Sequence, residues 1–153
     1  MKYKRLGTEE LQALESDFVR FLASAQITGP DWEKMKQNEP EKAEELIEVF
    51  SDVVYDKVMS KIKYLEFRDE KTMNIFYCDV DKIQLVGLRV KENSSLDLMK
   101  ENWMEQWNAQ QSSITLVKSE KKYSKEREVE VFELLQSGCF ITNNELFDKL
   151  MLL

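Results

Sequence analysis

The fold of this chain is decided by residues 64–91, YLEFRDEKTMNIFYCDVDKIQLVGLRVK. In residues 64–68 the apolar and polar side chains alternate, with Leu65 and Phe67 on one side, which is the period of a β-strand. Residues 72–78 are rich in β-forming residues, and the three residues that follow are typical of a turn. Residues 82–91 then predict a second long strand.

The alternation slips within this second long strand. Ile83 and Leu85 share one side, whereas Val86 and Leu88 share the other, and Gly87 lies beside the slip. A β-bulge at Val86-Gly87 explains the change of side, because a bulge inserts one extra residue into a strand. The alternative is a regular strand that is buried on both faces.

Helical spacing flanks the strands on both sides. Before them, apolar residues recur every three or four positions in residues 8–25 and 40–62, with a short helical piece between. After them the pattern predicts a helix over 94–110, a strand over 112–118, and helices over 124–138 and 146–150. We therefore predict a single α+β domain spanning residues 1–153. Its order is α-α-β-β-β-α-β-α-α, with an antiparallel or mixed sheet of about four strands and helices packed on one face.

The composition excludes several kinds of chemistry. The 153 residues include no histidine, so Ser-His-Asp and Cys-His nucleophile pairs and His-ligated zinc are excluded. The four glycines are scattered, so neither a P-loop nor a dinucleotide fingerprint can be written. The two cysteines, Cys78 and Cys139, have no metal-ligand or redox spacing. We expect no cofactor.

The charge and hydropathy of the chain bear on its partners and its compartment. The formal net charge is −7, which makes nucleic-acid binding unlikely, since each neutralised phosphate needs a Lys or Arg. No stretch approaches the roughly 20 apolar residues of a membrane span. The basic residues of the segment before Gly7 are not followed by an apolar run, so it does not resemble a secretory signal. We expect a cytoplasmic protein.

One candidate site consists of carboxylates. Asp79 and Asp81 lie at the predicted turn between the two long strands and could bind a divalent metal or share a proton. Aspartate is also a favoured turn residue, because its side chain bonds to nearby main-chain N–H groups. Turn formation already accounts for both residues, so the metal site is the weaker interpretation.

A second candidate site is aromatic. Trp103 and Trp107 are four residues apart, and Met99 continues their stripe on the predicted 94–110 helix. Core packing against the sheet is the simpler interpretation. The alternative is an anchor patch for a protein partner, because Trp and Met are enriched at the centres of interfaces.

Together these features predict a non-enzymatic protein-interaction or scaffold module that binds a protein partner or forms a homodimer. An apolar C-terminal run, Leu146 to Leu153, also needs cover from its own domain or from a partner. The alternatives are an enzyme that depends on carboxylates or a divalent metal, and a domain that binds a small ligand.

Three segments carry a family resemblance. They are MKYKRL at residues 1–6, EPEKAEELI at residues 39–47 and VGLRV at residues 86–90. With them the chain resembles a family of small proteins of unknown function from Bacteroidetes bacteria. The resemblance implies a bacterial cytosolic origin, and it implies no particular chemistry.

Overall fold

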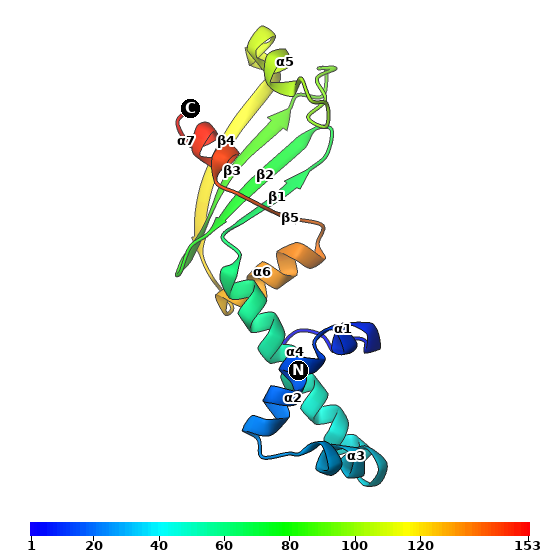
Figure 1. Ribbon diagram of the computed structural model, residues 1–153. Coiled ribbons are helices and arrows are strands. Elements are labelled where there is room, and N and C mark those ends of the chain that lie inside the picture. The colour runs from blue at the N-terminus through cyan, green and yellow to red at the C-terminus, as the bar shows by residue number, and fades with distance from the viewer. The chain divides into compact units, whose positions relative to one another are not determined.

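A computed structural model describes all residues from 1 to 153. It contains seven α-helices, a short 3-10 helix at Gln111–Ser113 and five β-strands (Figure 1). The chain divides into two compact units, Met1–Val58 and Met59–Leu153. The prediction of a single domain remains a prediction, which calorimetric unfolding would test.

The first unit is helical. It contains α1 (Thr8–Ala13), α2 (Glu15–Ser24), α3 (Gly29–Asn38) and most of α4 (Pro40–Lys61). The helix predicted over residues 8–25 is interrupted at Leu14, which lies between α1 and α2. An aromatic cluster holds the unit together, because the ring of Phe18 lies 5.0 Å from that of Phe50 and 5.2 Å from that of Trp32.

The second unit contains the sheet. The strands are β1 (Tyr64–Arg68), β2 (Thr72–Cys78), β3 (Lys82–Val90), β4 (Ile114–Lys122) and β5 (Phe140–Thr142). Their order is β4-β3-β2-β1-β5, and every neighbouring pair is antiparallel. This confirms the predicted α+β class and element order. The fifth strand, β5, is not predicted from the sequence. It consists of three residues between the predicted helices 124–138 and 146–150, and these residues pair with β1.

The predicted β-bulge at Val86-Gly87 is wrong. The pairing of β2 with β3 runs without interruption through Asn74–Gly87 and Ile75–Val86. The strand is regular, and its apolar residues face both sides of the sheet. Val86 and Leu88 are fully buried on one face, and the neighbouring parity places Ile83 and Leu85 on the other.

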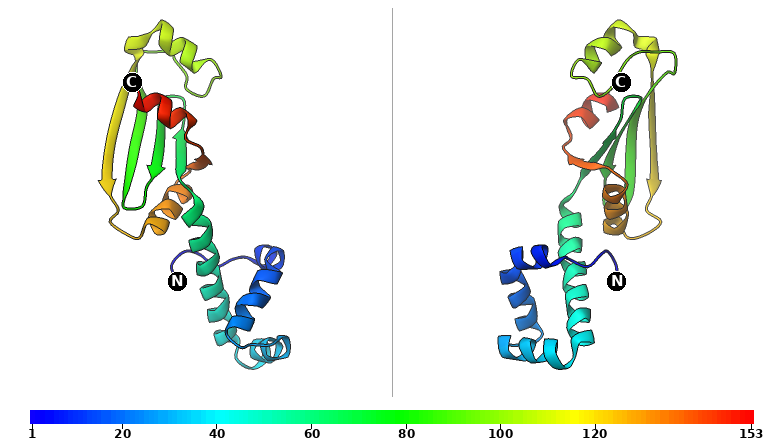
Figure 2. Two further views of the ribbon diagram at one scale, coloured as in Figure 1. Left: turned by 60° about the vertical axis from the view of Figure 1, so that its left-hand side comes forward. Right: turned by 90° about the vertical axis from the view of Figure 1, so that its right-hand side faces the viewer.

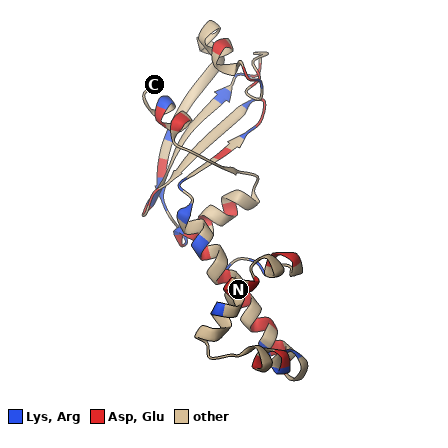
Figure 3. Ribbon diagram, in the orientation of Figure 1, with Lys and Arg blue, Asp and Glu red and all other residues tan.

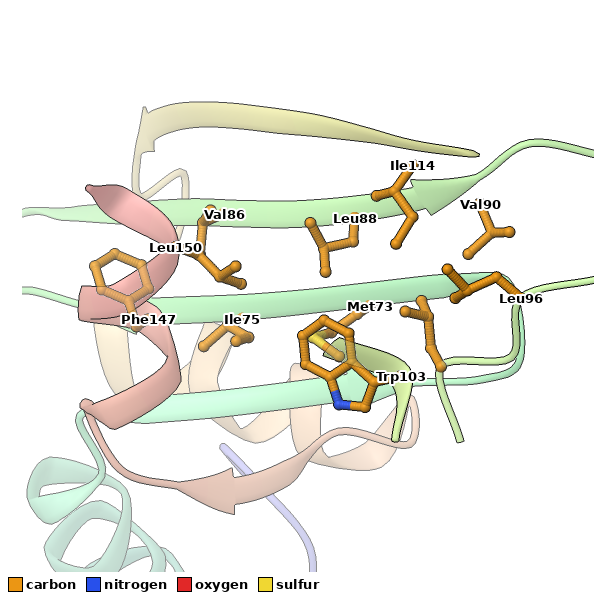
Figure 4. Packing of buried hydrophobic residues seen from close by; sticks show 11 residues of the cluster. Met73, Ile75, Val86, Leu88, Val90, Leu96, Trp103, Ile114, Phe147 and Leu150 are labelled. Atoms are coloured by element: carbon orange, nitrogen blue, oxygen red, sulfur yellow. The ribbon is translucent and has the colours of Figure 1, made fainter. Parts of the chain in front are cut away.

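Helices α5 (Trp103–Ala109) and α7 (Glu145–Met151) cover one face of the sheet (Figure 2). Met73, Ile75 and Leu88 form the floor of this core, and α7 adds Phe147 and Leu150 (Figure 4). Helix α6 (Arg127–Gln136) instead contacts the opposite face at one end, where Glu130 pairs with Lys121 at 3.3 Å. We call the face that carries α5 and α7 the helix face.

The helix predicted over residues 94–110 is much shorter in the structure, because α5 begins only at Trp103. Two local hydrogen bonds explain the difference. The N–H of Leu96 donates to Ser94 Oγ at 3.1 Å, and the N–H of Met99 donates to Asp97 Oδ1 at 2.8 Å. Such side-chain acceptors compete with helical bonds and favour turns.

Candidate functional site

Strand β4 forms one edge of the sheet, so one side of its main chain has no neighbouring strand. The N–H of Lys91 donates to the carbonyl of Ser113 at 2.8 Å, which fixes the bonding pattern between β3 and β4. Because bonded and non-bonded pairs alternate along an antiparallel ladder, every second residue of β4 turns its N–H and C=O outward. The residues with outward main-chain groups are Ile114, Leu116, Lys118, Glu120 and Lys122.

A hollow of about 310 Å³ borders the beginning of this edge. Helix α5 contributes Trp107 to its wall, and β4 contributes Ile114. The complete lining is Trp107, Asn108, Gln111, Ile114 and Leu153. An apolar side chain next to an open strand edge is the arrangement that receives one residue of an added strand.

A second hollow of about 240 Å³ lies farther along β4 and includes Lys118, Glu120 and Met151. Lys118 follows Ile114 by four residues, which is about 13 Å along a strand. Since side chains alternate, both residues project on the helix face. The two hollows therefore lie along the same edge. Residues i and i+4 of an added strand would have the spacing needed to reach both.

The two tryptophans have different roles in this site. Their rings stack with centroids 6.3 Å apart, but only Trp103 belongs to the buried core, at 6% exposure. The guanidinium of Arg68 lies 5.8 Å from the Trp103 ring and pairs with the buried carboxylate of Glu66 at 2.7 Å. Trp103 thus fixes the position of Trp107, which remains partly accessible at the hollow.

Met99, the third residue of the predicted aromatic stripe, lies outside α5 and is 59% exposed. The structure therefore brings Trp103 and Trp107 together, and Met99 does not share their helical face. Whether these residues contact a partner remains a prediction.

The second half of β4 is basic. Lys118, Lys121 and Lys122 outnumber the single carboxylate of Glu120 (Figure 3). Lys118 Nζ donates to the carbonyl of Met151 at 3.0 Å, and the ammonium group of Lys82 lies 3.3 Å from Glu120. A hydrogen bond from Gln84, followed by Lys82, lowers the pKa of Glu120. The edge therefore has a net positive charge at neutral pH.

Asp79 and Asp81 lie at the turn between β2 and β3, as predicted. The Asp79 carboxylate accepts the N–H of Val80 at 2.8 Å, and its N–H donates to the carbonyl of Lys82 at 3.0 Å. These bonds give Asp79 a role in the turn. No group of three or more His, Cys, Asp or Glu residues is placed to hold a metal ion. The metal-dependent alternative stays a prediction, which a thermal shift with Mg²⁺ or Mn²⁺ would test.

Both cysteines are buried and unpaired. Burial raises the pKa of the Cys78 thiol to about 11, although the nearby charge of Arg127 acts in the opposite direction. Burial also raises the pKa of Cys139. Neither thiol has the lowered pKa of a nucleophilic cysteine.

The whole chain, residues 1–153, matches DUF6495, a family of unknown function. The chain belongs to this family. Neither the curated proteins nor the solved structures contain a match to it. Membership of DUF6495 confirms the predicted resemblance to a family of unknown function, and no activity comes with it. The structure has no helix that combines enough length with enough apolar character to cross a membrane.

Proposed function

We propose that this chain is a protein-interaction module that binds an extended, acidic segment of a partner protein along β4. The observation that carries the proposal is the outward-facing edge of β4, bordered at its beginning by the Trp107 hollow. Unpaired main-chain groups supply the hydrogen bonds of such a complex, and a side-chain pocket supplies selectivity.

The charge of β4 favours an acidic segment over a second copy of the chain. In two β4 strands placed side by side, the three lysines of one strand would lie close to those of the other. Within each strand only Glu120 would oppose them, and outside it Glu130 pairs with Lys121 alone. Lysines on an edge strand are a common protection against pairing between copies. Opposite charges across neighbouring strands stabilise pairing by roughly 0.2–1 kcal/mol each.

The spacing of the hollows sets the pattern of the bound segment. An apolar side chain at one position would enter the hollow beside Trp107 and Ile114. The residue four positions farther would lie near Lys118, where a carboxylate is favoured. We therefore expect an apolar residue and an acidic residue on the same face of the partner strand.

A peptide selection tests this proposal directly. Random twelve-residue peptides would be selected on the immobilised full chain, and the winners measured by fluorescence anisotropy. We expect an apolar and an acidic residue four positions apart. Trp107→Ala and Lys118→Glu should each weaken binding by about tenfold, the effect of roughly 1.4 kcal/mol. Thr115→Ser is the matched control, because Thr115 turns its main chain inward and its side chain to the other face.

The Leu116→Pro variant tests whether peptide binding depends on main-chain pairing at the edge of β4 or on side-chain contacts alone. Proline at this position removes an outward N–H and leaves the bonds to β3 in place. It should abolish peptide binding in a protein whose melting transition remains cooperative. Peptides that bind Leu116→Pro and the parent equally well would overturn the proposal.

Light scattering after gel filtration decides between a separate partner and a second copy. We expect a monomer. A dimer that Leu116→Pro dissociates would assign the β4 edge to a second copy and would contradict the acidic-segment proposal.

We also propose that the protein is bacterial and cytoplasmic. The two buried free cysteines support a reducing compartment, and the resemblance described above supports a Bacteroidetes source. Fractionation of cells that express the chain tests the compartment. Recovery in a secreted or membrane fraction would contradict it.

A further inference from the structure

The face of the sheet opposite the helix face carries a polar site at its centre. Pairing between strands places Phe67, Asn74, Gly87 and Val117 in one row across β1, β2, β3 and β4. Arg89 lies two residues beyond Gly87 on the same strand and therefore on the same face. This row differs from its neighbours because its centre is a glycine, which leaves space above the main chain.

Arg89 uses that space. Its Nη1 donates to the carbonyls of Leu88 at 3.0 Å and Met73 at 3.2 Å, so the guanidinium lies against the strands. A Cβ added to Gly87 would come within 2.8 Å of Nη1. The guanidinium can therefore occupy this position because residue 87 has no side chain.

The hydrogen bonds of Arg89 involve only Nη1, so the Nε and Nη2 side of the guanidinium is left for an acceptor. These two nitrogens form the side-on fork that binds both oxygens of a carboxylate. No protein carboxylate occupies the fork, since no ion pair includes Arg89.

Asn74 adds an acceptor that lacks a donor. Its Oδ1 is fully buried and accepts no hydrogen bond. It is the only buried side-chain nitrogen or oxygen atom without a hydrogen-bond partner. This oxygen lies 2.9 Å from the same Cβ position that Arg89 Nη1 approaches. A buried oxygen without a donor is unfavourable, and a ligand N–H or O–H would supply the missing hydrogen bond.

Apolar side chains flank these two polar groups. Phe67 and Val117 lie in the same row, and Phe76 and Leu85 form the next row, all partly buried. Such a surface would contact the hydrocarbon part of a ligand whose polar end reaches Arg89.

We propose that the Asn74–Gly87–Arg89 site binds a carboxylate that has an N–H donor one or two atoms away. The carboxylate pairs with Nε and Nη2 of Arg89, and the N–H donates to Asn74 Oδ1. Free N-acylated amino acids and the C-terminal residue of a peptide share this chemistry. The site lies on the other face from the Trp107 hollow, so it is independent of peptide binding along β4.

Titration of the full chain followed by NMR tests the site. The probes are N-acetyl-leucine, its C-terminal amide, and a six-residue peptide ending in leucine with a free or an amidated C-terminus. We expect the Gly87 main-chain and Asn74 side-chain signals to shift with the two free acids, and binding at least about tenfold weaker for both amides. Tighter binding of the free-acid peptide than of N-acetyl-leucine would identify a protein C-terminus as the source, and comparable affinities would identify a small acid.

Three variants make the assignment specific. Arg89→Gln should lose at least about tenfold in affinity for the acids and should leave the weak amide binding unchanged. Arg89→Lys keeps the charge and should recover only part of the loss, since it lacks the fork. Trp107→Ala should leave acid binding unchanged. Equal binding of acid and amide, undiminished binding in folded Arg89→Gln, or no shift with any probe would overturn the proposal.

Discussion

The guanidinium of Arg127 is hydrogen-bonded to the main chain of Cys78. The Cys78 carbonyl oxygen accepts hydrogen bonds from Nη2 at 3.0 Å and from Nε at 3.3 Å. The same group donates to the carbonyls of Met59 at 3.1 Å and of Ile62. Met59 lies in the last turn of α4 and Ile62 directly follows the helix, where few main-chain donors are left for carbonyl groups. The Met59 carbonyl also accepts the N–H of Ile62 at 3.2 Å. Arg127 thus joins the end of α4, the end of β2 and the beginning of α6.

Replacement of Arg127 should therefore be costly. In Arg127→Met the carbonyls of Met59, Ile62 and Cys78 lose a charged donor, and we expect the free energy of unfolding to fall by about 3 kcal/mol. Urea denaturation followed by circular dichroism measures this change. Arg127→Lys should recover only part of it, since one ammonium group cannot reach all of these carbonyls. The exposed Lys125→Met is the control, and a similar loss in both proteins would contradict the role of Arg127.

The two tryptophans should respond differently to substitution. Trp103→Leu removes buried contacts with the sheet and should cost about 3 kcal/mol of unfolding free energy, whereas Trp107→Leu should cost about 1 kcal/mol. Acrylamide quenching in a Trp32→Phe background provides a second measurement. Trp107 should account for most of the quenching, and a strongly quenched Trp103 would show that it is not a core residue.

The strands could be predicted from sequence because alternation is a local property. The change of side at Val86-Gly87 suggests a bulge, but it arises because β3 packs on both faces. The short β5 gave no such pattern, since three residues are too few to show a period. Its path depends on Gly138, whose φ of +112° turns the chain after α6.

The candidate sites are harder to predict from the sequence than the strands. The spacing of Trp103 and Trp107 places them together, but which of the two is buried depends on the position of α5 over the sheet. The open edge of β4 follows from the order of the strands, which alternation does not reveal. An isolated glycine within a strand is itself a signal of close approach, and at Gly87 the approaching group is the Arg89 guanidinium.

Gly87→Ala should destabilise the sheet. The added Cβ would lie 2.9 Å from Val117 Cγ2 and 2.8 Å from Arg89 Nη1, and the valine is the less able of the two to move. We expect a loss of about 1–3 kcal/mol in the free energy of unfolding. Val117→Ala removes the rigid neighbour, so the double variant should be more stable than the sum of the single changes by at least about 0.5 kcal/mol. Strict additivity would show that the crowding is relieved elsewhere.

Cys78 should make the stability of the protein depend on pH in the alkaline range. Burial raises the pKa of this thiol to about 11 in the folded state, whereas the pKa of an unfolded cysteine is about 8.5. Below about pH 7 the thiol is neutral in both states and contributes no pH dependence. Above that pH the unfolded chain ionises first, so stability falls as the pH rises and the loss is complete near pH 11. By linkage the loss amounts to roughly 3 kcal/mol.

Comparison of the parent with Cys78→Ala isolates this effect. Tyr64, whose pKa is also raised, is present in both proteins, so its contribution cancels in the difference. Burial raises the pKa of Tyr123 and the charge of Cys78 raises it further, so the variant also loses this coupling, which adds to the difference in the same direction. Urea denaturation at intervals between pH 7 and pH 11 should show the two stability curves converging as the pH rises, because the variant lacks the titrating thiol. Curves that stay parallel over this range would mean that Cys78 ionises as readily in the folded protein as in the unfolded chain, and its burial would then not be that of the native state in solution.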